Sequence, residues 1–205
     1  SGAGRSGKFL ASEYWPEATP DIVALAKGLS AGYIPLGACM TSNKIVQAVQ
    51  DSGGFMHGHT YSASPIAAAI GRAVLAEYRD HGLIENAAKM GELLKERLKD
   101  VADRYHFIGE VKGRGLFLGF DVVADRRTGK PFPPELLVYQ KITRLAYELG
   151  LIIYSRRVMN GIRGDNFLIT PPLTVTELQI EEIIELLIAA LGKFETEVCY
   201  CKNVP

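Results

Sequence analysis

The sequence has no excess charge of either sign and no long hydrophobic run. Lysine and arginine together number 23, aspartate and glutamate together also number 23, and the formal net charge is zero at pH 7. This balance argues against nucleic-acid or anionic-membrane partners, because both select basic surfaces. No apolar run reaches the length of a bilayer span, and no signal segment opens the chain. We therefore expect a cytoplasmic protein.

Cysteine is also scarce. The three cysteines, Cys39, Cys199 and Cys201, make an odd and sparse set, so no disulfide framework is implied. Free thiols fit a reducing compartment. In contrast, 47% of the 205 residues are hydrophobic, which is enough for a buried core. The 21 glycines cluster, and clustered glycines indicate tight turns near ligands.

The first part of the chain reads as an α/β domain. Ile22 to Ala26 is a short apolar run between polar residues, the pattern of a strand buried on both faces in a parallel sheet. The other expected elements of this part are a strand within 33–40, a short helix at 43–50, a polar loop at 52–64, a helix at 66–80 opened by Pro65, and a long amphipathic helix at 83–105.

The second part reads as a small α+β domain. Thr176 with Gln179 fits a capping box that opens the last helix. The other expected elements are strands within 109–123, a turn at 126–134, a helix at 134–149 closed by Gly150, and short strands at 151–154 and 166–170. We therefore expect a large-domain part at 1–105, a small domain at 106–198 and a tail at 199–205.

The glycine-rich start resembles a nucleotide loop but lacks its context. Gly2 to Gly7 matches G-x-G-x-x-G, and Gly2 to Lys8 matches most of a P-loop. A P-loop needs serine or threonine after the lysine to bind Mg²⁺, and Phe9 stands there. No strand precedes Gly2 in this sequence and no clear helix follows, although both nucleotide motifs need them. A plain glycine-rich turn is the better interpretation.

Lys27 is the first candidate for chemistry. It follows a predicted buried strand, and ligands of open α/β sheets bind beyond the carboxyl ends of strands. Its neighbours Ala26 and Gly28 are small and leave room for a planar ligand. A desolvated lysine has a lowered pKa and can form a Schiff base. An ordinary lysine whose charged end reaches solvent is the alternative.

Two further segments carry polar residues suited to ligands. His57 to Ser62 supplies hydroxyl and backbone N–H groups next to a helix start, which suits a phosphate group. His57 and His59 alone are weak evidence for a metal, and we expect none. The sequence places Arg156, Arg157 and Arg163 close together. Clustered arginines bind carboxylates through bidentate hydrogen bonds. The alternative is a run of solvated surface arginines, which is the more common case.

Taken together, these residues resemble the class III aminotransferases, which are enzymes of pyridoxal 5'-phosphate (PLP) fold type I. The resemblance covers residues 1 to about 198. The segments that carry it are Gly-Arg-Ser-Gly-Lys at 4–8, the stretch 20–38 around Lys27, Gly-His-Thr-Tyr-Ser at 58–62, Gly-Arg-Gly-Leu-Phe-Leu-Gly at 113–119, and Pro-Pro-Leu-Thr at 171–174.

The resemblance implies a fold, a cofactor and residue roles. The fold would be the C-terminal part of a PLP fold type I large domain, a mostly parallel sheet with helices, followed by a small α+β domain. Lys27 matches the lysine that holds PLP as a Schiff base and then moves a proton between the substrate Cα and the cofactor C4′. Thr60 matches the residue that binds the PLP phosphate of the neighbouring subunit, which implies a dimer with shared sites.

The sequence departs from the family in two places. The family carries an Asp-Glu-Val segment before the position of Ser1, whose Asp pairs with the pyridine nitrogen, and this segment is absent here. The chain therefore resembles a C-terminal half that needs an N-terminal half-chain. Leu168 also stands where many members carry a carboxylate-binding arginine. Gly164-Asp165-Asn166 with a nearby arginine resembles the ω-amino acid or amine:pyruvate subgroup, in which a mobile arginine accepts a substrate carboxylate. Arg163 is the candidate for that arginine, and Arg157 and Arg156 stay open.

The leading hypothesis is a PLP-dependent aminotransferase. It would move an amino group from an ω-amino acid or amine to a keto acid such as pyruvate. The same fold also supports aminomutases, racemases and decarboxylases, so those activities stay open. A third hypothesis is a non-catalytic fragment that works only with its complementary half.

Overall fold

The chain folds as two compact units. The structure is a computed structural model that describes residues 2–157 and 164–202. The first unit is Ser1–Glu85 and the second is Asn86–Pro205. The sequence places the boundary after residue 105, at the end of the long helix α3 (Leu83–Arg104). The division between the two compact units falls near the start of α3, and the domain boundary after residue 105 stays a prediction.

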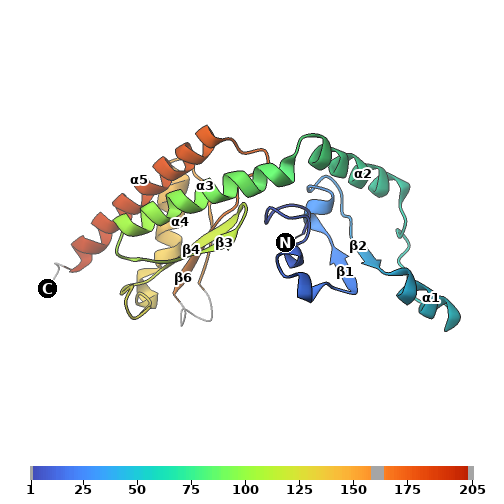
Figure 1. The fold of residues 1–205 in the computed structure, drawn as a ribbon. Coiled ribbons are helices and arrows are strands. Elements are labelled where there is room, and N and C mark those ends of the chain that lie inside the picture. Colours follow the sequence, from blue (N-terminus) through green and yellow to red (C-terminus); the bar gives the residue numbers. More distant parts are fainter. Residues whose placement is uncertain (1, 158–163, 203–205) are drawn as a thin grey trace. The chain divides into compact units, whose positions relative to one another are not determined.

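The first unit contains short elements and one long helix (Figure 1). Its elements are the 3₁₀ turns η1 (Ala11–Tyr14), η2 (Pro16–Ala18) and η3 (Lys27–Leu29), the strands β1 (Ile22–Leu25) and β2 (Ala38–Thr41), and the helices α1 (Asn43–Asp51) and α2 (Pro65–Asp80). The strand expected within 33–40, the short helix and the loop at 52–64 are confirmed.

Strand β1 pairs antiparallel with β2, with Ile22 opposite Thr41 and Leu25 opposite Ala38. The prediction that this run is buried on both faces is wrong for this chain. Its residues alternate between exposed and half-buried, and Ile22 is 58% exposed. The reason is that β2 is its one neighbouring strand among the described residues, so the apolar surface of β1 stays uncovered.

Helix α2 begins with a favourable N-cap. The Ser64 hydroxyl accepts a hydrogen bond from the Ala67 N–H at 3.5 Å, and Pro65 occupies the first turn. Its buried residues are Ala67, Gly71, Val74 and Tyr78, spaced as one face of a helix. The helix ends before Gly82, whose φ of 58° suits glycine in a left-handed turn.

The second unit is an antiparallel sheet with helices. Its strands lie in the order β3–β4–β6–β5 and all neighbouring pairs are antiparallel. Besides α3, its elements are β3 (Ile108–Arg114), β4 (Phe117–Val122), η4 (Pro134–Leu136), α4 (Val138–Glu148), β5 (Tyr154–Arg157), β6 (Asp165–Ile169) and α5 (Glu177–Lys202).

Helices α3 and α5 lie side by side (Figure 1). Arg97 on α3 donates from Nε to both carboxylate oxygens of Glu181 on α5, at 2.9 and 3.1 Å. The Tyr105 hydroxyl donates to the Ile188 carbonyl at 3.0 Å. The five predicted apolar positions of α3 are all buried, and they are Ala87, Met90, Leu94, Leu98 and Val101. The amphipathic pattern therefore predicted the packed face of this helix correctly.

One face of the sheet carries the core. Phe120 on β4 lies opposite Phe167 on β6, and their rings stack with centroids 5.2 Å apart. Leu118 and Ile169 form the next pair on this face, and both are buried. The alternation seen in the sequence therefore corresponds to real strands with one buried face.

Three sequence-based boundaries in this unit are wrong. The helix expected at 134–149 breaks at Leu137, where φ is 48°, because the chain leaves the 3₁₀ turn before α4 begins. The strand expected at 151–154 begins only at Tyr154, because residues 151–153 lack a ladder partner. The tail expected at 199–205 is helical as far as Lys202, since backbone hydrogen bonds continue α5 without an apolar pattern.

None of the helices in the part of the chain that the structure describes combines the length and the apolar character that a membrane crossing requires.

Candidate active site

Lys27 lies where the sequence predicts, directly beyond the carboxyl end of β1. It is the first residue of η3 and its backbone is left-handed, with φ of 53°. A lysine in this conformation is strained, and such strain persists only where the surroundings impose it. The Lys27 side chain is exposed in this chain, as is its neighbour Ala26. The Lys27 side chain is therefore open to solvent just beyond the end of a strand.

The glycine-rich start of the chain packs against the turn that carries Lys27. A Cβ atom added to Gly28 would lie 3.2 Å from the Ala3 Cβ and 3.6 Å from the Gly2 carbonyl oxygen. Ala3 is itself buried and left-handed, with φ of 57°. The start of the segment that matches G-x-G-x-x-G therefore packs against η3. Its small residues are needed for this close approach.

Helix α2 supports the same turn from another side. The Tyr78 hydroxyl donates to the Gly28 carbonyl oxygen at 2.8 Å. Burial raises the pKa of Tyr78 above its ordinary value, and the nearby Arg5 guanidinium opposes that rise. The phenol therefore stays protonated at neutral pH and remains a hydrogen-bond donor. Sequence reasoning missed Tyr78, although its place on the buried stripe of α2 implies a partner for the hydroxyl.

After η3 the chain turns back toward β2. The buried Ser30 hydroxyl donates to the Ile34 carbonyl oxygen at 2.6 Å. Ala31 and Gly32 are both left-handed, with φ of 49° and 85°. Lys27 thus sits in a turn held at its start by Gly28 contacts and at its end by Ser30.

Thr60 lies on the exposed loop that leads into α2. The loop is held by two reciprocal hydrogen bonds, from the His59 N–H to the Ser62 hydroxyl at 3.0 Å and from the Ser62 N–H to the His59 carbonyl at 2.9 Å. Thr60 is exposed inside this turn, close in sequence to the N-terminus of α2. No hydrogen bond among the described residues joins Thr60 to Lys27, so the chain by itself presents the two groups separately.

The two histidines of this loop form an edge-to-face pair. The His57 and His59 rings lie with centroids 4.9 Å apart. Within residues 2–157 and 164–202, no group of three side chains suited to a metal ion comes together.

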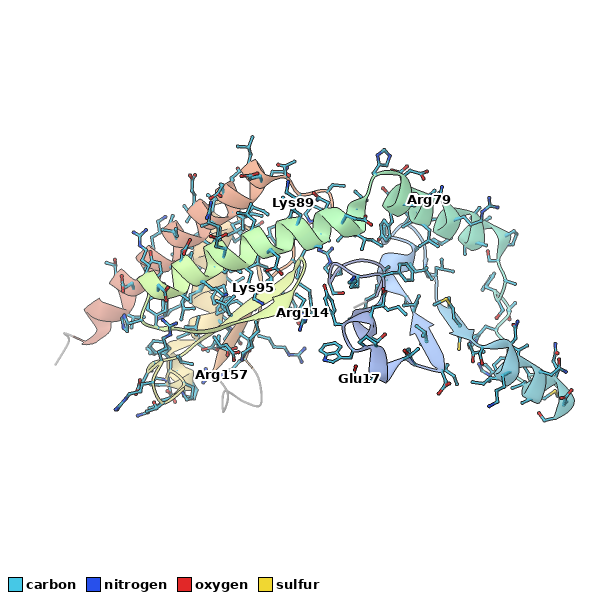
Figure 2. All side chains as sticks on the ribbon, viewed as in Figure 1. Glu17, Arg79, Lys89, Lys95, Arg114 and Arg157 are labelled. Atoms are coloured by element: carbon cyan, nitrogen blue, oxygen red, sulfur yellow. The ribbon has the colours of Figure 1, made fainter. Side chains whose placement is uncertain are left out.

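Of the predicted arginines, Arg157 is labelled in Figure 2 and belongs to the second unit. Arg157 donates from its two terminal nitrogens to the carbonyl oxygens of Pro134 and Phe132, at 3.2 and 3.4 Å. Arg156 is exposed on the other face of β5. Arg163 lies outside the described residues.

Comparison with known proteins identifies the family. The profile of the aminotransferase class-III family matches residues 1–191. The chain belongs to this family. It is 43% identical over 188 residues to the uncharacterized aminotransferase YodT of Bacillus subtilis (strain 168), covering 91% of this chain and 42% of that protein. It is 32% identical over 190 residues to the putrescine–pyruvate aminotransferase of Pseudomonas aeruginosa, covering 90% of this chain and 39% of that protein.

A solved structure confirms the fold. The amine transaminase from an uncultivated Pseudomonas species, determined with PLP bound, superposes with a TM-score of 0.84 at 38% identity. The match covers 94% of this chain and 42% of that one. The chain therefore spans about two fifths of the length of these relatives, and its fold is that of the C-terminal region of a class III aminotransferase.

Class III aminotransferases depend on PLP, and the residues present fit that cofactor in two respects. Lys27 presents an amine between two small residues, on a turn that the surrounding elements hold in a strained conformation. The loop of Thr60 offers hydroxyl and N–H groups to a phosphate.

Proposed function

We propose that this chain is the C-terminal half of a PLP-dependent transaminase. It moves an amino group from an ω-amino acid or an amine to a keto acid such as pyruvate. The observation that carries the proposal is the exposed Lys27 at the end of β1, on a left-handed turn held by Gly28 and Tyr78. The name of the putrescine–pyruvate relative supports the choice of an amine donor and pyruvate acceptor.

Lys27 holds the cofactor and moves the proton. PLP supplies the electron sink of the reaction, and the protein supplies position and a base. Lys27 would hold PLP through its Nζ, and the same amine, once released, would act as the base that takes the proton from the substrate Cα. The turn around Gly28 fixes the backbone from which Nζ extends, which is how orientation would contribute to catalysis.

Thr60 binds the phosphate of PLP held by a neighbouring subunit. Its exposure on the loop before α2 supports this role, since an exposed hydroxyl is open to a group from outside the chain. The active unit is accordingly a homodimer with shared sites, in the cytoplasm.

Arg163 binds the substrate carboxylate in preference to Arg157. The terminal nitrogens of Arg157 already donate to two backbone carbonyls, which reduces its freedom to take a second anion. An arginine that accepts a carboxylate from one substrate and withdraws for an uncharged amine suits a single pocket with two kinds of substrate.

The site is completed by an N-terminal half outside this chain. The resemblance assigns to that half the carboxylate that pairs with the pyridine nitrogen and the aromatic residue that stacks on the ring. The exposed apolar side chains of β1 support this division, because packing of further chain over them would lower their free energy.

The test is amino transfer by a fusion protein. The N-terminal region of the Bacillus subtilis relative is placed ahead of this chain, and pyruvate consumption is measured with putrescine and with an ω-amino acid as donor. Lys27→Ala is expected to lower the rate by about a hundredfold to ten-thousandfold, as for loss of an acid–base group. Lys44→Ala, at an exposed lysine of the same unit, is the matched control and leaves the rate unchanged.

Two results would contradict the proposal. Turnover of an amino acid without consumption of pyruvate would assign the chain to a racemase, aminomutase or decarboxylase. A fusion that is folded and binds PLP, yet transfers no amino group from any donor, would make the chain a non-catalytic part.

A further inference from the structure

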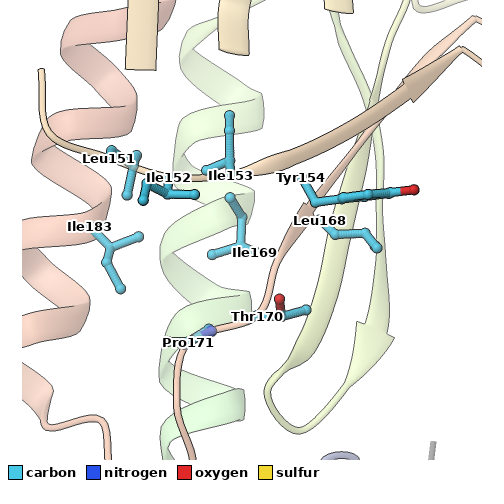
Figure 3. A pocket seen from close by; sticks show the side chains of 9 residues that line it. All are labelled: Leu151, Ile152, Ile153, Tyr154, Leu168, Ile169, Thr170, Pro171 and Ile183. Atoms are coloured by element: carbon cyan, nitrogen blue, oxygen red, sulfur yellow. The ribbon is translucent and has the colours of Figure 1, made fainter. Parts of the chain in front are cut away.

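The two units differ in the polar groups that they offer to chemistry. The second unit has a hollow of about 330 Å³ beside α5, and Figure 3 shows the side chains that line it. Among the described residues of this lining, Tyr154 and Thr170 are the polar ones and none is charged. In the first unit, by contrast, the buried Tyr78 donates a hydrogen bond into the turn that carries Lys27. Tyr78 therefore bears directly on the backbone of the candidate site.

Lys27 occupies the second position of a four-residue turn. The Leu29 N–H donates to the Ala26 carbonyl oxygen at 3.2 Å, and this bond closes the turn. Turns with a positive φ at this position favour glycine, asparagine or aspartate, yet Lys27 has a φ of 53° there. A residue with a Cβ atom adopts this backbone only at a cost in free energy. Contacts from outside the turn must therefore offset that cost.

Such contacts meet at Gly28, the residue after Lys27. Its carbonyl oxygen accepts a hydrogen bond from the Tyr78 hydroxyl at 2.8 Å and a longer one from the Ala31 N–H at 3.2 Å. Ala31 belongs to the same stretch of chain, so the bond from Tyr78 is the one that ties Gly28 to a separate element. Gly28 also lies close to the start of the chain, because a Cβ atom built on it would be 3.2 Å from the Ala3 Cβ.

Helix α2 presents Tyr78 to the turn from a closely packed face. Gly71 and Tyr78 are seven residues apart, which is about two helical turns, and both are buried. A Cβ atom built on Gly71 would lie 2.7 Å from the Leu36 Cδ2 and 3.8 Å from the Leu29 carbonyl oxygen. The helix therefore approaches the residues after Lys27 closely, and the Tyr78 hydroxyl reaches Gly28 from a fixed backbone.

We propose that Tyr78 is a positioning residue for Lys27. By holding the Gly28 carbonyl, its hydroxyl keeps the Lys27 backbone left-handed and so fixes the direction in which the side chain leaves the turn. Tyr78 acts through Lys27 and not on the cofactor. This role rests on the proposed function, in which Lys27 holds PLP.

The chemistry of that attachment makes the direction of the side chain matter. The Lys27 Nζ forms a C=N bond to the aldehyde carbon of PLP, the C=O bond breaks, and the oxygen leaves as water with two protons from the amine. A lysine held in one backbone conformation is competent for this step in a larger fraction of molecules. The apparent affinity for PLP rises with that fraction.

The test compares two forms of the cofactor in the same fusion protein, freed of PLP. PLP can join Lys27, whereas pyridoxamine phosphate carries an amine in place of the aldehyde and cannot. Isothermal titration calorimetry gives the dissociation constant of each. Tyr78→Phe is expected to weaken PLP binding about threefold to tenfold, as for loss of one neutral hydrogen bond, and to leave pyridoxamine phosphate binding unchanged. A merely structural loss would weaken the binding of both forms alike.

Tyr14→Phe is the matched control. The Tyr14 hydroxyl also donates to a backbone carbonyl of the first unit, that of Ser6, at 2.7 Å, but Ser6 lies outside the turn of Lys27. The variant removes the same chemical group and is expected to leave both dissociation constants unchanged. Borohydride reduction followed by peptide mass spectrometry identifies the lysine that PLP has joined in each protein.

The positioning role is overturned if Tyr78→Phe weakens both forms equally, or neither, in a fusion whose parent joins PLP at Lys27. That result leaves the proposed function standing. Equal weakening of PLP binding by Tyr14→Phe and Tyr78→Phe also overturns the role. A folded parent fusion that joins PLP at another lysine, or at none, contradicts the proposed function and the positioning role together.

Discussion

At the scale of single residues, the least expected group is Asp165. It is fully buried on the core face of β6, and neither of its carboxylate oxygens has a hydrogen-bond partner among the described residues. Arg157 lies directly opposite it on β5, and the Arg157 Nε is buried without a partner in the same part of the structure. Burial raises the pKa of Asp165, and the charge of Arg157 opposes that rise.

A raised pKa makes the second unit less stable as the pH rises. The folded state retains the Asp165 proton at pH values where the unfolded chain has released it. The contribution of this group is therefore fully present below the ordinary value of 3.8 and is lost as the pH rises through the higher folded value.

Asp165→Asn removes this titration. We expect the stability of the variant relative to the parent to improve steadily from below pH 3.8 toward neutrality. Urea unfolding followed by far-ultraviolet circular dichroism at a series of pH values checks the prediction. A stability difference that does not change with pH, or that changes in the opposite direction, would show that Asp165 is ionised at no cost in the folded protein.

At the scale of elements, the turn of Lys27 depends on α2. The single hydrogen bond from Tyr78 to the Gly28 carbonyl joins a helix to a turn fifty positions away in the sequence. Tyr78 is mostly buried, so loss of its hydroxyl leaves the carbonyl without that partner. An unsatisfied buried carbonyl is costly, whereas an exposed one is rescued by water.

Tyr78→Phe is expected to lower the free energy of unfolding of the first unit by about 1–3 kcal/mol. The one tryptophan of the chain, Trp15, lies in this unit, so its fluorescence in urea follows the first unit selectively. Tyr147→Phe, at a tyrosine of the second unit that is 69% exposed, is the control and leaves the Trp15 transition unchanged. Equal midpoints for parent and Tyr78→Phe would show that the bond does not support the turn.

The elements that the sequence predicts well are those with a strong local pattern. Helix α3 repeats apolar residues on one face, and Ser64 with Pro65 marks the start of α2, so both are confirmed. The run at 151–154 has the composition of a strand, yet a strand also needs a neighbour, and residues 151–153 lack one here. The exposure of β1 has the same origin, since sequence patterns carry no information on which partners are present.

The candidate site shows the same contrast between features set by local sequence and features set by distant residues. The position of Lys27 beyond a strand is local, so the sequence predicts it. The contacts that hold the turn come from Ala3 and Tyr78, which are distant along the chain, and no local pattern connects them to Lys27. Tyr78 is visible in the sequence only as a polar aromatic residue on a buried helical stripe.

At the scale of the whole molecule, the central fact is the share of the family fold that this chain contains. It matches the class III aminotransferase family over residues 1–191 and spans about two fifths of its relatives. It supplies the lysine turn, the loop of Thr60 and a second unit built on the four-stranded sheet β3–β4–β6–β5. Under the proposed function, these parts are the C-terminal contribution to a larger enzyme.

The most direct test of this account is the chemical capture of the cofactor. The fusion with the Bacillus subtilis N-terminal region is incubated with PLP, reduced with borohydride and digested, and the peptides are identified by mass spectrometry. We predict a phosphopyridoxyl group on the peptide that contains Lys27, and its loss in Lys27→Ala but not in Lys44→Ala. A folded fusion that carries the group on another lysine, or on none, would contradict the assignment of Lys27.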